Sequence, residues 1–153
     1  MILNRQRAVR VALPPLERFF SRVKRELGLQ HAEITICLVS DAEIARMNQA
    51  FRKKKGATDV LSFPAEDRSR PMRITRPRVS AKGRSVAAEF LGDIAIAPAT
   101  ARRNTARYGR NLDDEMRVLI LHGVLHLLGY DHQTDCGQMD RVESRLRAKL
   151  RLT

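Results

Sequence analysis

Three of the four histidines of this chain, His122, His126 and His132, lie within eleven residues. Residues four apart lie one above the other on a helix, so a helix here directs the imidazoles of His122 and His126 to a common atom. Gly129 lets the chain leave the helix, because glycine accepts the left-handed conformation that ends helices, and His132 can then return from the far side. Three protein nitrogens leave one position of a tetrahedral zinc ion open. The spacing therefore predicts a catalytic zinc site with one ion per chain.

The same spacing is typical of metzincin proteases, H-E-x-x-H-x-x-G-x-x-H, in which the glutamate beside the first histidine is the general base. In this chain Gly123 stands where that glutamate would be. The ligands are therefore present without the protease base, which indicates different chemistry on the bound ligand. The alternative is that the histidines pack in the core and bond to backbone carbonyls. That alternative suits a lone histidine on an apolar helix better than three at this spacing.

Four consecutive basic residues follow a predicted helix: Arg52, Lys53, Lys54 and Lys55. Arg52 precedes a short predicted strand, a position that would hold it near a cleft. Because a guanidinium matches two phosphate oxygens at once, we expect Arg52 to hold a phosphate group, and the lysines to contact a polyanion such as nucleic acid. A solvated helix end, favoured by the helix dipole, explains the lysines equally well.

The overall charge points to a polyanionic partner. The chain has 29 Lys and Arg against 17 Asp and Glu, a formal net charge of +12, which favours nucleic acid or an acidic membrane surface. The segment 68–84 has seven basic residues, no acidic one, and two prolines, a composition typical of a mobile loop. Such a loop either tracks a phosphate backbone or is an unconstrained insertion; its candidate nucleic-acid contacts are Arg73, Arg76 and Arg78.

Two further features bear on the compartment. No apolar run approaches the roughly 18 residues that cross a bilayer, and charge interrupts the N-terminus before a signal-peptide core can form. The two cysteines, Cys37 and Cys136, do not suggest a disulfide framework. We expect a cytoplasmic protein.

Hydrophobic periodicity predicts one α+β domain over residues 1–153, with a small mixed sheet of about four strands covered by about five helices. Strands are predicted at 2–11, 33–39, 59–63 and 91–97. Helices are predicted, in chain order, at 14–27, at 40–51, after Pro98, at 112–128, and after Asp135, which with Gln138 can cap the last helix. In the second helix, Ser40 and Glu43 form a capping-box signature, and Ile44, Met47, Ala50 and Phe51 form the apolar stripe. The second of these helices, 40–51, ends just before the basic run, and the helix 112–128 carries His122 and His126.

The run HGVLHLLGYDH over 122–132, with NQAFRKKKGATDVLSFP over 48–64 and LGDI over 91–94, resembles the YbeY family of bacterial rRNA-maturation endoribonucleases. The order of predicted elements agrees along nearly the whole chain. The resemblance implies an α+β fold with a zincin-like metal helix, Zn²⁺ held by His122, His126 and His132, and Arg52 as the important basic residue. It also implies single-strand-specific cleavage of RNA in 16S rRNA 3′-end maturation and ribosome quality control.

The partners that the resemblance implies are single-stranded RNA, rRNA, and the small ribosomal subunit with its proteins; neither DNA nor a membrane is expected. The segment between Pro64 and Leu91 looks longer and more basic than is usual in the family. The nucleophile stays open between a zinc-activated water and the 2′-hydroxyl of RNA. Asp131 either orients a ligand imidazole or serves as a turn residue.

Two other classes of function remain open from the sequence. One is a ribosome-associated RNA-binding factor with weak or no catalysis. The other is a zinc protease-like hydrolase, against which Gly123 is the argument.

Overall fold

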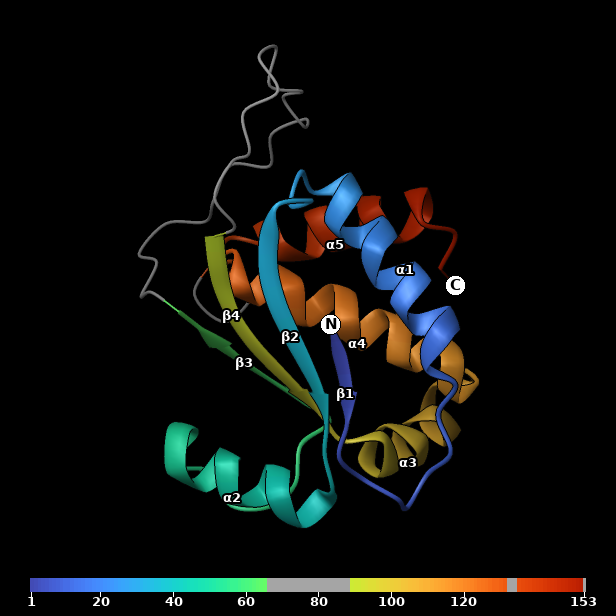
Figure 1. The fold of residues 1–153 in the computed structure, drawn as a ribbon, viewed down its shortest axis with the longest axis vertical. Coiled ribbons are helices and arrows are strands. Elements are labelled where there is room, and N and C mark those ends of the chain that lie inside the picture. The colour runs from blue at the N-terminus through green and yellow to red at the C-terminus, as the bar shows by residue number, and fades with distance from the viewer. Residues whose placement is uncertain (66–88, 132–134, 153) are drawn as a thin grey trace.

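The computed structural model describes residues 1–65, 89–131 and 135–152 (Figure 1). In these residues the chain forms four strands and five helices: β1 (Ile2–Asn4), α1 (Leu13–Glu26), β2 (Ala32–Leu38), α2 (Asp41–Arg52), β3 (Val60–Pro64), β4 (Glu89–Ile96), α3 (Pro98–Tyr108), α4 (Leu112–Leu127) and α5 (Gln138–Lys149). This order confirms the α+β fold predicted from the sequence. No helix in the described part of the chain is long and apolar enough to span a membrane.

The four strands form one mixed sheet in the order β1-β2-β4-β3. β1 pairs with β2 and β2 with β4 in parallel, whereas β3 runs antiparallel to β4, with Val60 opposite Ile96 and Pro64 opposite Gly92. The predicted alternation in β2 is confirmed, because Ile34, Ile36 and Leu38 are all buried. The topology places β3 at an edge of the sheet, with one side unpaired within the described residues.

α4 is the central helix and contacts β3, β4, α1, α3 and α5. Asn111 caps its N-terminus by accepting a hydrogen bond from the Asp114 backbone N–H at 2.8 Å, and three acidic residues in the first turn complement the helix dipole. Its apolar positions are buried nearly all round, which is the pattern of a core helix rather than a surface helix. The helix that carries His122 and His126 is therefore held on several sides.

α2 packs on the opposite face of the sheet. Side chains alternate along β4, so Ile94 and Ile96 enter the main core while Ala95 joins a second, smaller cluster with Ile44 of α2. Ser40 caps α2 as predicted, accepting a hydrogen bond from the Glu43 backbone N–H at 3.1 Å.

A polar network fixes the start of α2 to α3. Asp41 accepts hydrogen bonds from Thr100 Oγ1 at 2.7 Å and from Arg103 Nη2 at 2.8 Å. Burial alone would raise the pKa of Asp41, but the hydrogen bonds from Thr100 and Arg103 outweigh it and hold the pKa below its ordinary value. The network therefore orients the helix whose far end reaches the candidate site.

The largest differences from the sequence expectation lie at two boundaries. The first strand ends at Asn4 and not at residue 11, because the Gln6 side chain folds the chain back: its Nε2 donates to the Val9 carbonyl at 2.8 Å and its Oε1 accepts from the Val9 N–H at 3.0 Å. α5 begins at Gln138 and not directly after Asp135. The Asp135 carboxylate still accepts the N–H groups of Gly137 and Met139, at 2.8 Å each.

Candidate functional site

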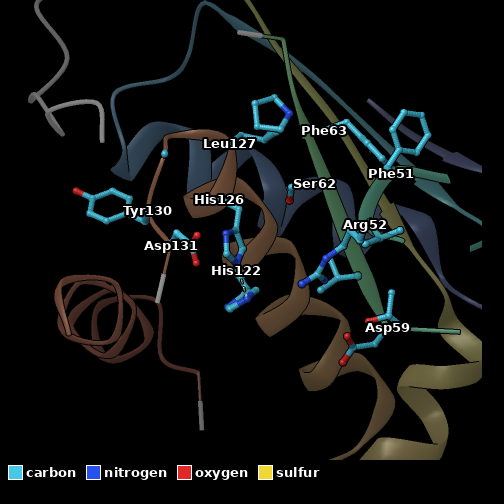
Figure 2. A pocket seen from close by; sticks show the side chains of 15 residues that line it. Phe51, Arg52, Asp59, Ser62, Phe63, His122, His126, Leu127, Tyr130 and Asp131 are labelled. Atoms are coloured by element: carbon cyan, nitrogen blue, oxygen red, sulfur yellow. Dashed lines mark hydrogen bonds between the residues drawn. The ribbon is translucent and has the colours of Figure 1, made fainter. Parts of the chain in front are cut away.

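A cleft of about 550 Å³ opens between β3, the end of α2 and the C-terminal part of α4. Figure 2 shows the labelled side chains that line it, with the two histidines on α4 and Arg52 facing them from the end of α2. Its wall also includes residues 58–64 around β3 and the turn after α4, Gly129, Tyr130 and Asp131. The sequence runs that were predicted to carry chemistry, 48–64 and 122–131, therefore meet in one place.

The imidazoles of His122 and His126 converge, as their spacing predicts. Their Nε2 atoms lie 3.0 Å apart, and the rings meet edge to face with centroids 4.6 Å apart. Two nitrogens that bind one zinc ion at about 2.0–2.1 Å in a tetrahedral arrangement lie about 3.3 Å apart. This pair of donors therefore fits a shared zinc ion.

The third predicted ligand, His132, lies outside the described residues. Within the described ranges, no three His, Cys, Asp or Glu side chains are placed together to hold a metal ion. The described part of the chain thus brings two of the three predicted ligands together.

Glu143 of α5 is a residue of the site that the sequence reasoning missed. Its Oε1 lies 3.4 Å from His122 Nδ1, on the side of the ring away from His126. Burial raises the pKa of Glu143, but the hydrogen bond and charge of His122, together with Arg147, outweigh it, so the pKa lies below its ordinary value. A carboxylate on the distal nitrogen fixes the tautomer and orientation of a metal-binding histidine. The available signal was a carboxylate next to Val142, a member of the apolar stripe of the last helix.

The end of α4 confirms the role expected of Gly129. Gly129 has φ +97° and donates its N–H to the His126 carbonyl at 3.0 Å, while the Tyr130 N–H bonds to the Leu125 carbonyl at 3.1 Å. This pair of hydrogen bonds is the Schellman motif, which ends helices at a left-handed residue. The motif turns Tyr130 and Asp131 along the cleft, and the two proposed uses of Asp131 both remain predictions.

Gly123 has a packing role that explains its place between the histidines. A Cβ atom added there would lie 2.9 Å from Ile94 Cγ2 and 3.1 Å from Ile94 Cδ1, and Ile94 is fully buried in β4. Ser62 of β3 also donates a hydrogen bond to the Gly123 carbonyl at 2.9 Å. The position that carries the general base in metzincins is therefore pressed against the sheet, where a glutamate does not fit.

Arg52 ends α2, and the next residue, Lys53, adopts the left-handed conformation with φ +53°. The Asn48 side chain holds the following turn through a hydrogen bond from its Nδ2 to the Gly56 carbonyl at 3.1 Å. In the described part of the chain the Arg52 guanidinium forms no hydrogen bond or ion pair, and it lines the cleft opposite the histidines (Figure 2). This placement leaves its donors available to an anion.

The other predicted RNA contacts do not line the cleft or lie outside the described residues. Lys53, Lys54 and Lys55 are exposed beside the cleft but do not line it. Arg73, Arg76 and Arg78 lie outside the described residues, so their predicted role is untested.

Comparison with known proteins agrees with this arrangement. The sequence model of the family described as endoribonuclease YbeY matches residues 2–151. Two relatives with that name come from Solibacter usitatus, 40% identical over 91% of this chain and 80% of the relative, and from Koribacter versatilis, 36% identical over 99% and 86%. The fold also resembles the solution structure of TM1509 from Thermotoga maritima, with a TM-score of 0.61 and 22% identity over 98% of this chain and 89% of that one.

An α+β chain with a histidine-bearing core helix and an arginine across a cleft defines a candidate hydrolase acting on an anionic substrate. By its sequence and its matched length, the chain belongs to the endoribonuclease YbeY family.

Proposed function

We propose that this protein is a zinc-dependent endoribonuclease that cuts single-stranded RNA in the cytoplasm. In this proposal it acts in 16S rRNA 3′-end maturation and ribosome quality control, with the small ribosomal subunit as its partner. Family membership and the net charge of +12 support an RNA substrate. The observation that carries the site is the convergence of two histidine nitrogens in a cleft whose opposite wall bears Arg52.

The residues that would hold the zinc ion are His122, His126 and His132. A bound zinc ion supplies Lewis-acid chemistry, which polarises a phosphoryl oxygen or activates water at neutral pH. Glu143 keeps the His122 ring oriented so that its Nε2 faces the cleft. α4, held on several sides by the core, limits the movement of both rings.

Arg52 would bind the scissile phosphate and stabilise the negative charge that develops on it. A guanidinium contacts two phosphate oxygens at once, and an unpaired one needs no rearrangement to do so. The absence of a side chain at Gly123 removes the base on which a metzincin protease depends, so peptide hydrolysis has no equivalent catalytic group at this position.

The test compares variants of the two walls of the cleft on a single-stranded rRNA fragment, with zinc content measured on the same samples. His126→Ala should lose zinc and cleavage together. Arg52→Ala should keep its zinc and lower the turnover rate by about 10²–10³-fold, the scale for losing one transition-state donor. Arg52→Lys should recover part of that loss, because an ammonium cannot make the two-pronged contact.

Matched controls are available on the same molecule. His31→Ala changes an exposed histidine outside the cleft, and Arg46→Ala changes an exposed arginine on α2 itself. Both should cleave at the wild-type rate. His126→Ala must also fold and bind RNA like the wild type for the comparison to hold. If the wild-type protein then cleaves RNA no faster than His126→Ala does, the protein is an RNA-binding factor and not a nuclease. A substrate with a 2′-deoxy nucleotide at the cleavage site separates the two candidate nucleophiles, since only the 2′-hydroxyl route is blocked.

A further inference from the structure

Phe51 is an exposed aromatic residue at the edge of the candidate site. The sequence pattern put it in the apolar stripe of α2, but in the structure Ile44 is fully buried while Phe51 remains 70% exposed. Ile44 belongs to the second core cluster and Met47 packs against it, whereas Phe51, at the end of α2, lies outside the cluster. The apolar-stripe prediction is therefore wrong at this residue, and the exposed ring calls for another explanation.

The Phe51 ring packs against an aromatic neighbour. It meets Phe63 of β3 edge to face, with ring centroids 4.9 Å apart and planes at 68°. Phe63 is itself half-buried against the second core cluster. An aromatic ring that is already oriented loses little conformational entropy when a flat ligand stacks on it.

The surroundings of Phe51 select the kind of ligand. Phe51 lines the cleft beside Arg52 (Figure 2). Three exposed lysines, Lys53 to Lys55, follow directly in the chain. Single-stranded nucleic acid combines a negatively charged backbone with flat, unpaired bases. It therefore suits a flat apolar ring that lies next to four positive charges. In duplex RNA the base faces are already stacked, so this surface has nothing to bind there.

We propose that Phe51 is a base-stacking residue, which binds the nucleobase next to the phosphate held by Arg52 and so favours unpaired RNA. This inference rests on the proposed function, and it adds a substrate-binding residue to that site. The stacked base fixes the strand so that its phosphate lies between Arg52 and the histidines.

The experiment measures affinity for a single-stranded RNA oligonucleotide and for a set of copies with one abasic nucleotide at each position in turn. Phe51→Leu keeps an apolar side chain but removes the aromatic face, and Phe51→Trp enlarges it. Phe51→Leu should weaken binding of intact RNA by about 5- to 150-fold, the range for losing one base–aromatic stack. Phe51→Trp should bind at least as well as the wild type.

The abasic series identifies the stack itself. In the wild type, one abasic position should weaken binding by a similar factor, and the same position should have no further effect in Phe51→Leu. Phe90→Leu is the matched control, because Phe90 is 48% exposed but does not line the cleft. Affinity for duplex RNA should be the same in the wild type and in Phe51→Leu.

Three outcomes decide the matter. Equal affinities of wild type and Phe51→Leu for single-stranded RNA overturn the stacking proposal and leave the nuclease proposal standing. Equal losses at every abasic position in both proteins also overturn it. A wild-type protein that neither binds nor cleaves RNA overturns both proposals, and Phe51 then belongs to a protein-binding surface.

Discussion

The packing of Gly123 leads to a prediction about stability that the structure makes quantitative. Carbon atoms in contact normally lie about 3.5–4.0 Å apart. The added Cβ of Gly123→Ala would lie 2.9, 3.1 and 3.4 Å from three atoms of the Ile94 side chain. Because Ile94 is fully buried, it cannot swing aside, and overpacking of this kind costs about 1–3 kcal/mol.

Helix propensity acts in the opposite direction. Gly123 lies inside α4, where replacing glycine by alanine stabilises a helix by about 1 kcal/mol. Since the nearest contact is well inside the normal distance, we expect the upper part of the overpacking range. The net loss should be about 2 kcal/mol, which lowers the Tm of a chain of this size by about 4–8 °C.

A double-mutant cycle with Ile94→Ala isolates the clash. Ile94→Ala alone should cost about 2–5 kcal/mol as a large-to-small core substitution. In that background the three contacts are gone, so Gly123→Ala should stabilise the protein by about 1 kcal/mol. The effect of Gly123→Ala therefore changes sign, with a coupling of about 3 kcal/mol.

The measurement is urea-induced unfolding of the four proteins with a chelator present, so that metal binding does not enter the free energy. The m-values should agree, since the unfolding reaction is the same. A stabilising effect of Gly123→Ala with Ile94 intact would show that α4 can move off the sheet at little cost. In that case packing would not be the reason why position 123 lacks a glutamate.

Three further predictions follow from other parts of the structure. Glu143→Gln should weaken zinc binding by about 10- to 100-fold in a competition assay with a chromophoric chelator, and an unchanged affinity would remove Glu143 from the site. The pKa of Asp41 lies below its ordinary value of 3.8, so its contribution to stability is present above that pH and is lost as the pH falls through the lower folded pKa. Asp41→Asn should thus be less stable than the wild type in urea at pH 7, and the difference should shrink as the pH falls below 3.8. Replacing Arg73, Arg76 and Arg78 by Gln should reduce the slope of log affinity against log salt by up to about 2, and an unchanged slope means that they do not contact phosphates.

The sequence predicted the histidine pair because helical periodicity is a local property. A separation of four residues places His122 and His126 on one face whatever the rest of the chain does, and their nitrogens do converge. The end of α4 at Gly129 and the cap of α2 at Ser40 were predictable for the same reason. In each case the atoms that interact lie within a few residues of one another.

The parts that the sequence did not predict depend on contacts between distant segments. Glu143 reaches His122 from another helix, 21 residues along the chain, and no periodicity shows which side of α5 meets α4. Phe51 fits the apolar spacing of α2, but its ring lies outside the second core cluster and stays 70% exposed. The packing of Gly123 against Ile94 depends on the approach of α4 to β4, which the order of elements leaves undetermined.

The charges around the cleft follow from this packing. With no room for a side chain at position 123, the residues of α4 that line the cleft are His122, His126 and Leu127, and the imidazoles are the polar groups among them. The facing wall carries the guanidinium of Arg52, which forms no hydrogen bond or ion pair within the described residues. A peptide carbonyl gains little from a fixed cation without a base to activate water, whereas a phosphodiester already carries the negative charge that a guanidinium binds. The loss of one side chain to helix–sheet packing thus favours phosphate over peptide as the substrate of this site.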